Sequence, residues 1–336
     1  MSPYICIIIL MLFCLNSKKY NKIFGILTVF SLVLFSAVRS VGSDWLLYKN
    51  IYLTQLYPLR FDVGYKYMMK IFYSIFKSNY FWFTLFNSIV TIGLISSNIK
   101  KQSKNFYLSL FFFIVLGFYT KSYNIMKQMF AVALTFYASK YLVNRNMIRY
   151  ICCIIFASFF HKTALIMIPF YWLSNVRLNK KLIFVSVLST FIAFVGFDHI
   201  FKFVTSIEQY NVYNSYDIGI DAGIGTLLNI LLFLTLIIIL AMNYKNLIKI
   251  DNKNKFYLNI CLFSIPIMVL ALKNTLFYRI SLYQLIYIIF PMVNIESIFE
   301  NRSKKIFNII FYTVLLTFYF LSIYKFGNVF PYKWII

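Results

Sequence analysis

The run "IGTLLNILLFLTLIIILAM" (224–242) has no charged side chain, and as a helix it is long enough to cross the hydrocarbon core of a bilayer. The chain of 336 residues is 61% hydrophobic and 12% charged, whereas soluble domains carry about 25% charged residues. Further apolar runs that span or nearly span a bilayer lie at 4–15, 23–38, 80–97, 106–120, 125–143, 182–197, 256–272, 280–293 and 306–324. We predict an all-α, polytopic integral membrane protein with about 10–12 transmembrane helices, forming a single membrane domain over 1–336.

The breaks between the apolar runs differ in charge. The chain has 33 lysines and arginines against nine acidic residues, and most of the basic residues lie in six breaks: 16–22, 100–104, 144–149, 175–181, 244–255 and 300–305. Less basic breaks lie at 39–79, 120–124, 198–223 and 273–279. Cytoplasmic loops are rich in Lys and Arg. The first set is therefore predicted to be cytoplasmic, with 39–79 as the main external loop and 198–223 as a second one. No separate basic domain exists, so nucleic acid is not expected as a partner.

The stretch 150–172 is long enough for one crossing but joins two basic breaks. A single crossing would place one of those breaks outside, so the charge rule favours an even number of crossings. We expect one re-entrant or broken helical hairpin with His161 at its outer tip, since irregular backbone at membrane depth is tolerated where protein buries it.

The segment "GYKYMMKIFYSIF" (64–76) inside the predicted external loop is amphipathic. Lys66 and Lys70 share one helical face, and the other face carries the aromatic and methionine side chains Tyr65, Met68, Met69, Phe72 and Phe76. Such a helix is expected to lie in the outer interface of the membrane.

Polar residues gather at one predicted level, the outer ends of the spans. They form four clusters: Arg39, Asp44 and Tyr48; Lys121, Lys127 and Gln128; His161 and Lys162; and Lys273, Arg279 and Tyr283. Each residue also has an ordinary explanation, such as snorkelling for the cations or turn capping for Asp44. Together, several cations near an outer cavity would suit a phosphate or pyrophosphate.

Several common site types are missing from the sequence. No phosphate-binding G-x-x-x-x-G-K-[ST] loop and no paired metal-ligand motif occurs, so neither a cofactor nor a metal is expected. The five cysteines lie in apolar runs and form no C-x-x-C pair. Because these site types are missing, we expect a donor substrate to come from within the membrane, as a lipid-linked molecule.

Five stretches resemble the EpsG family, which belongs with the Wzy-type polysaccharide polymerases, over about 250 residues and in the family's order. "AVRSVGSDWLLYKNIY" (37–52) resembles its first signature, with Arg39, Gly42, Asp44 and Tyr48 on motif positions. "FDVGYKYMMKIF" (61–72) resembles the segment that follows, with Gly64 at its glycine. The remaining three stretches are "NIMKQMFAVALTFYASKYL" (124–142), "FFHKTALIMIPFYWL" (159–173) and "FYRISLYQLIYIIFPM" (277–292).

The last three stretches place Gln128, His161, Arg279 and Tyr283 on family positions, while Lys127 stands where the family has arginine. A lysine can hold a phosphate as a point charge but lacks the bidentate fork of arginine.

The resemblance implies a glycosyltransferase that joins undecaprenyl-pyrophosphate-linked repeat units at the outer face of the bacterial cytoplasmic membrane, in O-antigen, capsule or exopolysaccharide synthesis. A flippase and a chain-length regulator of the same pathway would be partners, together with membrane lipid. On this reading Arg39, Lys127 and Arg279 hold the pyrophosphate. Gln128, Tyr48 and Tyr283 complete the substrate site. The general base is either Asp44 or His161.

Two other functions share some of these features. A transporter or flippase of lipid-linked oligosaccharide would also have many spans, but its polar residues usually gather at the membrane midplane. A membrane O-acyltransferase could use His161 as base, but it would take its acyl donor from the cytoplasm, whereas His161 is predicted outside.

Overall fold

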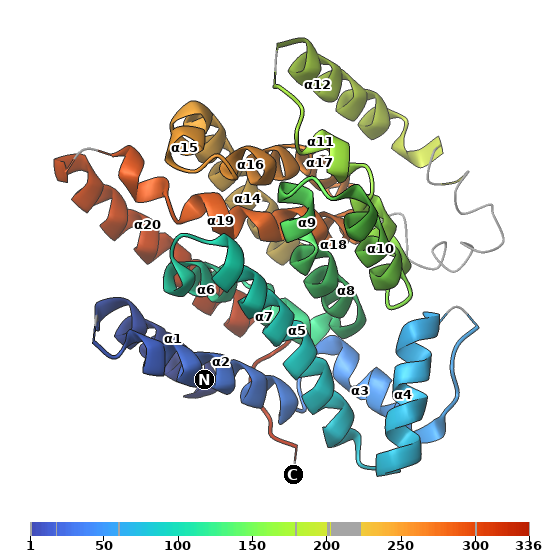
Figure 1. Cartoon of the computed structure of the whole chain (residues 1–336). Coiled ribbons are helices and arrows are strands. Elements are labelled where there is room, and N and C mark those ends of the chain that lie inside the picture. The colour runs from blue at the N-terminus through green and yellow to red at the C-terminus, as the bar shows by residue number, and fades with distance from the viewer. Residues whose placement is uncertain are drawn as a thin grey trace. The chain divides into compact units, whose positions relative to one another are not determined.

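The computed structural model describes residues 2–17, 19–59, 61–178, 180–199, 202, 223–299 and 301–335 (Figure 1). In these ranges the fold is helical, and the one isolated β-bridge pairs Arg39 with Trp334. The prediction of an all-α polytopic membrane protein is therefore confirmed. The predicted second external loop, 198–223, lies almost entirely outside the described residues.

The chain divides into two compact units, which are described separately: unit 1 is Met1–Ile168 with Met292–Ile336, and unit 2 is Pro169–Pro291. Unit 1 contains α1 (Ser2–Asn16), α2 (Asn21–Ala37), α3 (Ser43–Thr54), α4 (Val63–Phe76), α5 (Tyr80–Gln102), α6 (Phe106–Val115), α7 (Phe118–Asn124), α8 (Met126–Tyr137), α9 (Ser139–Val143), α10 (Met147–Ser158), η1 (Lys162–Met167), η4 (Ile295–Ile298), α20 (Asn301–Leu321) and η5 (Ser322–Phe326). Unit 2 contains α11 (Phe170–Leu173), α12 (Lys180–Val195), α14 (Ile224–Met242), α15 (Tyr244–Ile250), α16 (Asn254–Leu262), α17 (Ile265–Leu270), α18 (Thr275–Leu285) and η3 (Ile286–Ile288), and α19 (Ile289–Met292) ends at the boundary.

Four helical stretches among the described residues are long and apolar enough to cross a membrane: Tyr80–Gln102, Ile224–Met242, Thr275–Met292 and Ser303–Phe326. The pair α6 and α7, bent by 48°, adds a fifth if it is one span, and six shorter apolar helices account for most of the other predicted spans. Several predicted spans are interrupted. The run 256–272, for example, ends one helix at Leu262 and begins the next at Ile265, directly before Pro266.

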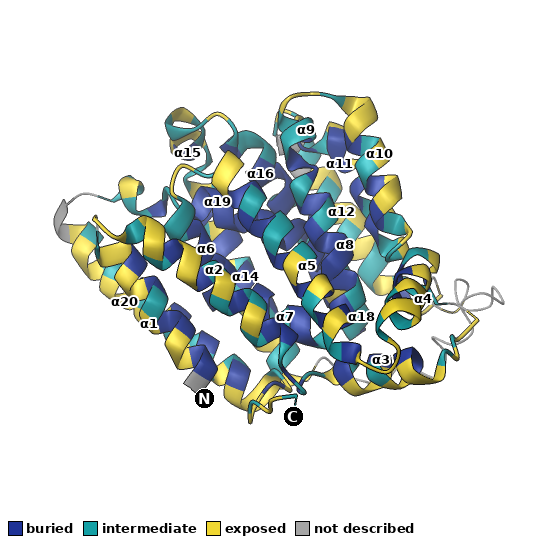
Figure 2. Cartoon of the chain, turned by 60° about the horizontal axis from the view of Figure 1, so that its bottom comes forward, coloured by how far each residue is buried: buried dark blue, intermediate teal, exposed yellow. Residues whose placement is uncertain are grey.

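The polarity of unit 1 is arranged for a membrane. The central helix α5 buries its small polar side chains, Thr84, Asn87, Ser88, Thr91 and Asn98. Ser88 donates to Ser36 of α2 at 2.8 Å, and Asn98 donates to the Phe136 carbonyl of α8 at 2.7 Å. The exposed faces of α1, α2 and α20 (Figure 2) instead carry large apolar residues such as Ile26, Phe30 and Ile309. Buried polar contacts between helices and an apolar exterior are what lipid favours, so this is a multi-pass membrane protein.

The segment 150–172 doubles back on itself, as predicted. After α10 the chain turns at 159–161 and continues into η1, which packs against α10. The Tyr150 hydroxyl, near the start of α10, donates to the Met167 carbonyl at 2.7 Å. The two ends of the hairpin are therefore close together, and His161 lies at the tip.

The amphipathic segment forms α4, and its aromatic and methionine face packs on protein. Tyr65, Met68 and Met69 are buried, and the Phe72 ring lies 4.9 Å from that of Phe86 on α5. Lys66 and Lys70 lie over the Tyr57 ring. The outward side carries Val63, Tyr67, Ile71 and Ile75, one helical turn apart and all exposed. The interfacial position of α4 remains a prediction.

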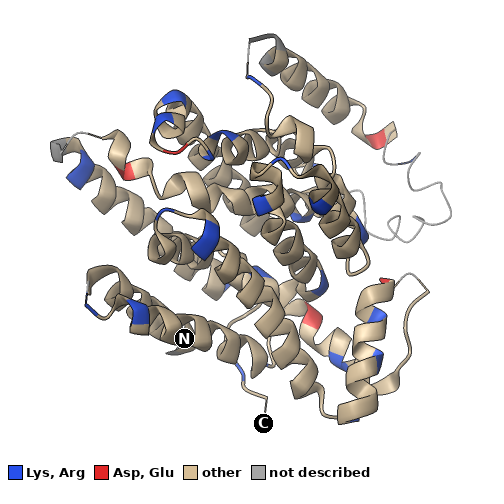
Figure 3. Cartoon of the chain, viewed as in Figure 1, with Lys and Arg blue, Asp and Glu red and all other residues tan. Residues whose placement is uncertain are grey.

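Unit 1 has two chemically different ends. At one end of α5 the Tyr80 ring packs on Trp45 and Tyr52 of α3. At the other end Lys101 approaches Tyr137, the last residue of α8, and Lys140 lies over the same ring at 3.8 Å. These ends are separated by about 34 Å, the length of the α5 helix. Charged segments are short and scattered along the ribbon (Figure 3).

Candidate functional site

The turn between α2 and α3, Arg39–Asp44, is fastened to the junction of α7 and α8. The Ser43 backbone N–H donates to the side-chain oxygen of Asn124 at 3.0 Å, and the Ser43 hydroxyl donates to the Asn124 carbonyl at 2.9 Å. Gly42 has a φ of +105°, and an added Cβ would lie 2.4 Å from the Tyr123 carbonyl oxygen. Only glycine fits this approach, so the turn and the junction hold each other in place.

Asp44 binds the free N-terminal end of α8. Its Oδ2 accepts a hydrogen bond from the Met126 N–H at 3.0 Å, an arrangement that satisfies an otherwise unpaired helix donor. Lys127 is the next residue, so Asp44 helps to fix the position of that ammonium group. Burial, followed by the nearby charge of Asp44, raises the pKa of the Tyr48 hydroxyl well above its usual range, and the phenol stays protonated.

Arg39 is fully buried. Its guanidinium donates to the carbonyl and the hydroxyl of Ser36 and approaches the Ser122 carbonyl at 3.5 Å, and it lies 4.2 Å from the centre of the Tyr123 ring. The C-terminal segment covers it from the other side through the bridge to Trp334. Arg39 thus joins the end of α2, the α7–α8 junction and the C-terminal segment.

The charged centre of unit 1 is Asp62, which sequence reasoning missed. Its Oδ2 lies 2.6 Å from Lys127 Nζ and 3.4 Å from His161 Nδ1, and its Oδ1 accepts from the Lys162 N–H at 3.2 Å. Burial favours the neutral carboxyl, but the hydrogen bonds and positive charge of His161 and Lys127 outweigh it, so the pKa of Asp62 is lowered and it stays ionised. The available signal was an acidic residue, one of only nine, directly before an amphipathic helix and two positions before its glycine, Gly64.

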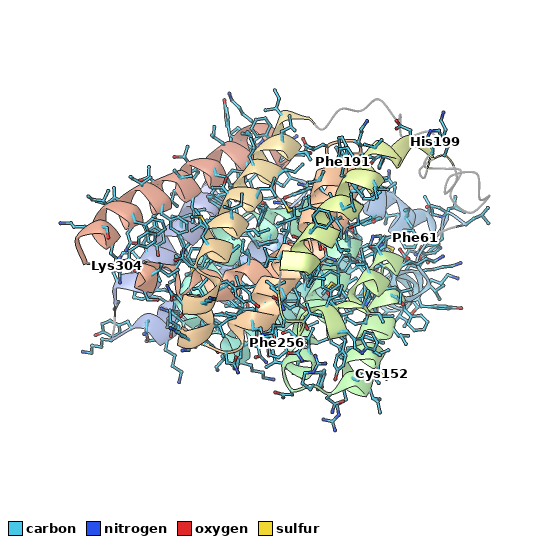
Figure 4. The ribbon with its side chains drawn as sticks, turned by 90° about the horizontal axis from the view of Figure 1, so that it is seen from above. Phe61, Cys152, Phe191, His199, Phe256 and Lys304 are labelled. Atoms are coloured by element: carbon cyan, nitrogen blue, oxygen red, sulfur yellow. The ribbon has the colours of Figure 1, made fainter. Side chains whose placement is uncertain are left out.

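Three chain segments that are far apart in sequence meet at this centre. The Gly64 N–H donates to the Phe159 carbonyl at 2.8 Å, and a Cβ on Gly64 would lie 2.9 Å from that oxygen. The start of α4 is therefore held against the tip of the hairpin. Lys127 lies 4.7 Å above the ring of Phe61, the residue between α3 and α4 that Figure 4 labels.

The cluster remains accessible at its rim. The side chains of Lys127 and His161 keep 15% and 24% of their surface exposed, while that of Asp62 keeps only 6%. Next to the cluster, the Tyr48 ring packs edge-on against Phe61 at 5.9 Å. A cation and an imidazole at the rim, joined by a buried carboxylate, can bind an anion and move a proton at the same place.

The structure brings together four of the predicted site residues, Asp44, Tyr48, Lys127 and His161, in unit 1. Gln128 is buried next to Lys127 on α8. Arg279 and Tyr283 lie in unit 2, one turn apart on α18, with Arg279 exposed and Tyr283 buried. Their place in a common site remains a prediction.

Unit 2 contains a cavity of about 880 Å³ between α12 and the helices α14–α17, and no predicted site residue lines it. Its walls are mostly apolar and include Leu182, Phe191, Phe194, Pro266 and Val269. Phe191, labelled in Figure 4, lies on the α12 side. Walls of this kind suit hydrocarbon more than a charged substrate.

Comparison with known proteins agrees with the resemblance read from the motifs. No curated protein and no solved structure matches the chain. The model of the EpsG family matches residues 21–334, which include Arg39, Asp44, Asp62, Lys127 and His161. The chain therefore belongs to the EpsG family, whose members are similar to Wzy-type polysaccharide polymerases.

Proposed function

We propose that this membrane protein of polysaccharide biosynthesis is a polymerase, a glycosyltransferase that joins undecaprenyl-pyrophosphate-linked repeat units at the outer face of the bacterial cytoplasmic membrane. The observation that carries the proposal is the convergence of Lys127 and His161 on Asp62, with both side chains reaching the rim. Family membership supports the general class of reaction.

The charge distribution of unit 1 supports an outward-facing site. Lys101, Lys140, Arg145 and Arg149 belong to the end of the unit opposite Lys127. By the positive-inside rule that end faces the cytoplasm, so the Asp62 cluster faces outward. Lipid-linked repeat units would meet the site there after a flippase has delivered them, and a chain-length regulator would act on the same side.

In the proposed reaction, the hydroxyl of the acceptor sugar attacks the anomeric carbon of the growing chain. The new C–O bond forms as the bond to the pyrophosphate oxygen breaks, and the electron pair leaves with undecaprenyl pyrophosphate. Lys127 stabilises the charge that develops on this leaving group. The hydroxyl proton passes to a base, and we assign that role to His161.

The choice of His161 over Asp44 follows from their contacts. Asp44 already accepts a hydrogen bond from the Met126 N–H and holds the end of α8. His161 contacts Asp62 through Nδ1 only, which leaves Nε2 for a substrate hydroxyl. Asp44 and the buried Arg39 then position Lys127, while Arg279 remains a second candidate for the pyrophosphate. Half-buried Phe61 offers an aromatic ring for a sugar, whereas Tyr48, predicted to contact substrate, is buried and packs against Phe61.

The experiment is replacement in cells that depend on this protein for their polysaccharide. Lys127→Met and His161→Gln should each lower polymer by about a hundredfold or more, since loss of one transition-state contact costs roughly 3 kcal/mol. Single repeat units should then replace long chains, with normal protein levels in the membrane. Lys101→Met, at the opposite end of unit 1, is the matched control and should leave chain length unchanged. Normal polymer in both site variants would remove the cluster from the reaction.

A further inference from the structure

One carboxylate oxygen serves two functional groups in the Asp62 cluster. Oδ2 of Asp62 lies 2.6 Å from Lys127 Nζ but 3.4 Å from His161 Nδ1, so the bond to lysine is short and the bond to histidine is long. The other oxygen is fixed by the Lys162 N–H at 3.2 Å. Asp62 is buried, and its position is set by the backbone of the hairpin tip.

The two contacts on Oδ2 compete. A lysine ammonium held at 2.6 Å withdraws charge from the oxygen that the imidazole also uses. A diphosphate carries more negative charge than one carboxylate, so it attracts Lys127 strongly when it reaches the rim. Once Lys127 turns toward that ligand, Oδ2 can shorten its contact with His161 Nδ1 without any change in the backbone.

We propose that Asp62 is a positioning residue whose Oδ2 changes its main hydrogen-bond partner from Lys127 to His161 when an anionic diphosphate head group binds Lys127. This inference rests on the proposed function. After this change of partner, the His161 Nδ1–H donates to Asp62, and Nε2 carries the free electron pair that takes the proton of the acceptor hydroxyl. The base is thus prepared only when the donor's leaving group is in place, and the imidazolium formed by proton transfer is stabilised by the same carboxylate.

Two other charged groups of the neighbouring elements have contacts of their own. Lys66 on α4 lies over the Tyr57 ring at 5.4 Å, and Asp44 in the first turn of α3 accepts from the Met126 N–H. Lys162 follows His161 on the hairpin and contributes its backbone N–H to Asp62. Among the residues that the structure describes, the ion pairs of both Lys127 and His161 end on Asp62.

The tautomer of His161 reports directly whether Asp62 has changed its hydrogen-bond partner. The chain has two histidines, His161 and His199, so the purified protein with ¹⁵N-labelled histidine gives two sets of ring signals, and His199→Gln assigns them. The measurement is the share of the Nδ1–H tautomer of neutral His161 at pH 8, with and without inorganic pyrophosphate as the probe. Its binding is followed separately by ³¹P line width.

The proposal predicts a mixed tautomer population in the free protein. Pyrophosphate should raise the Nδ1–H share roughly twofold, because the hydrogen bond at one ring nitrogen decides where the proton sits. Lys127→Met should give the same rise without pyrophosphate, whereas Lys101→Met should not. In Asp62→Asn, which keeps the shape but cannot form the ion pair, the tautomer share should no longer respond to pyrophosphate.

Two results would overturn the proposal. One is a wild-type tautomer ratio in Lys127→Met, which needs no ligand to be measured. The other is a pyrophosphate response of equal size in Asp62→Asn, since it would arise from the ligand's own charge. The proposed function fails separately: a tautomer shift without any polymer formation would contradict the polymerase, and polymer formation without the shift would contradict the role of Asp62.

Discussion

At the scale of single residues, the first family signature, 37–52, acts mainly through contacts with the backbone of another segment. Arg39, Gly42, Ser43 and Asp44 all touch the chain between Ser122 and Met126. The charged chemistry lies one step further, where Lys127 meets Asp62. A short motif can therefore mark a site by positioning it as well as by contacting the substrate.

Gly42 and Gly93 make a matched pair of glycines. Gly42→Ala must accommodate a positive φ and a Cβ 2.4 Å from the Tyr123 carbonyl, so we expect a loss of about 1–3 kcal/mol in unfolding free energy. Gly93→Ala on α5 meets nothing within 4 Å and should be neutral or slightly stabilising. Thermal unfolding in detergent measures both. Equal stability of the two variants would contradict the close packing of the turn.

The lowered pKa of Asp62 predicts a pH dependence of stability. The carboxylate is held ionised in the folded protein, so its contribution is present above its unfolded pKa near 3.8 and is lost as pH falls through the lower folded value. Asp62→Asn should therefore be less stable than the wild type at pH 7, and the gap should close toward pH 3. A difference in melting temperature between the two proteins that stays constant from pH 7 to pH 3 would show that the ion pair contributes nothing to stability.

At the scale of elements, the hairpin α10–η1 carries His161 to the same end of unit 1 as Lys127. The sequence predicted the doubling back because two basic breaks flank 150–172. It did not predict that several apolar runs are split into short helices, since hydropathy measures solvent preference and not the continuity of backbone hydrogen bonds. The partner of Lys127 was missed for a related reason: Asp62 and Lys127 are 65 positions apart, and no local pattern links them.

Labelling of single cysteines tests the direction of the hairpin. In a background without the five native cysteines, a cysteine replacing Lys162 should react with an impermeant reagent from outside, while cysteines replacing Lys101 and Arg145 should react only after permeabilisation. The expectation follows from the basic end of unit 1 facing the cytoplasm. Labelling of positions 162 and 101 from the same side would refute this arrangement.

At the scale of the whole molecule, the C-terminal segment ties distant parts of unit 1 together. The Ile335 N–H donates to the Val38 carbonyl at 2.7 Å, and the Ser40 N–H donates to the Lys333 carbonyl at 2.8 Å. The Tyr332 hydroxyl donates to the Phe35 carbonyl at 2.6 Å. These hydrogen bonds join the end of α2, next to Arg39, to residues that lie about 300 positions later in the sequence.

Replacing Ile335 by proline tests this connection. Ile335→Pro removes the N–H that serves the Val38 carbonyl, and leaving that acceptor without a partner should cost about 1–3 kcal/mol and lower polymer formation through the displaced α2–α3 turn. Ile335→Ala also loses the side chain but keeps the N–H. The comparison uses the melting temperature of the purified proteins. Equal melting temperatures of the two variants would show that the hydrogen bond from the Ile335 N–H has no role in stability.

The most direct measurement of the central claim is polymer formation by the purified protein in detergent micelles, supplied with undecaprenyl-pyrophosphate-linked repeat units. Micelles have no second compartment, so transport alone yields no product. We expect chains of several repeat units, with one undecaprenyl pyrophosphate released for each new linkage. Product formation should fall by about a hundredfold or more in Lys127→Met and His161→Gln but not in Lys101→Met. Binding of the lipid-linked units without any chain growth, under conditions where the protein remains folded, would contradict it.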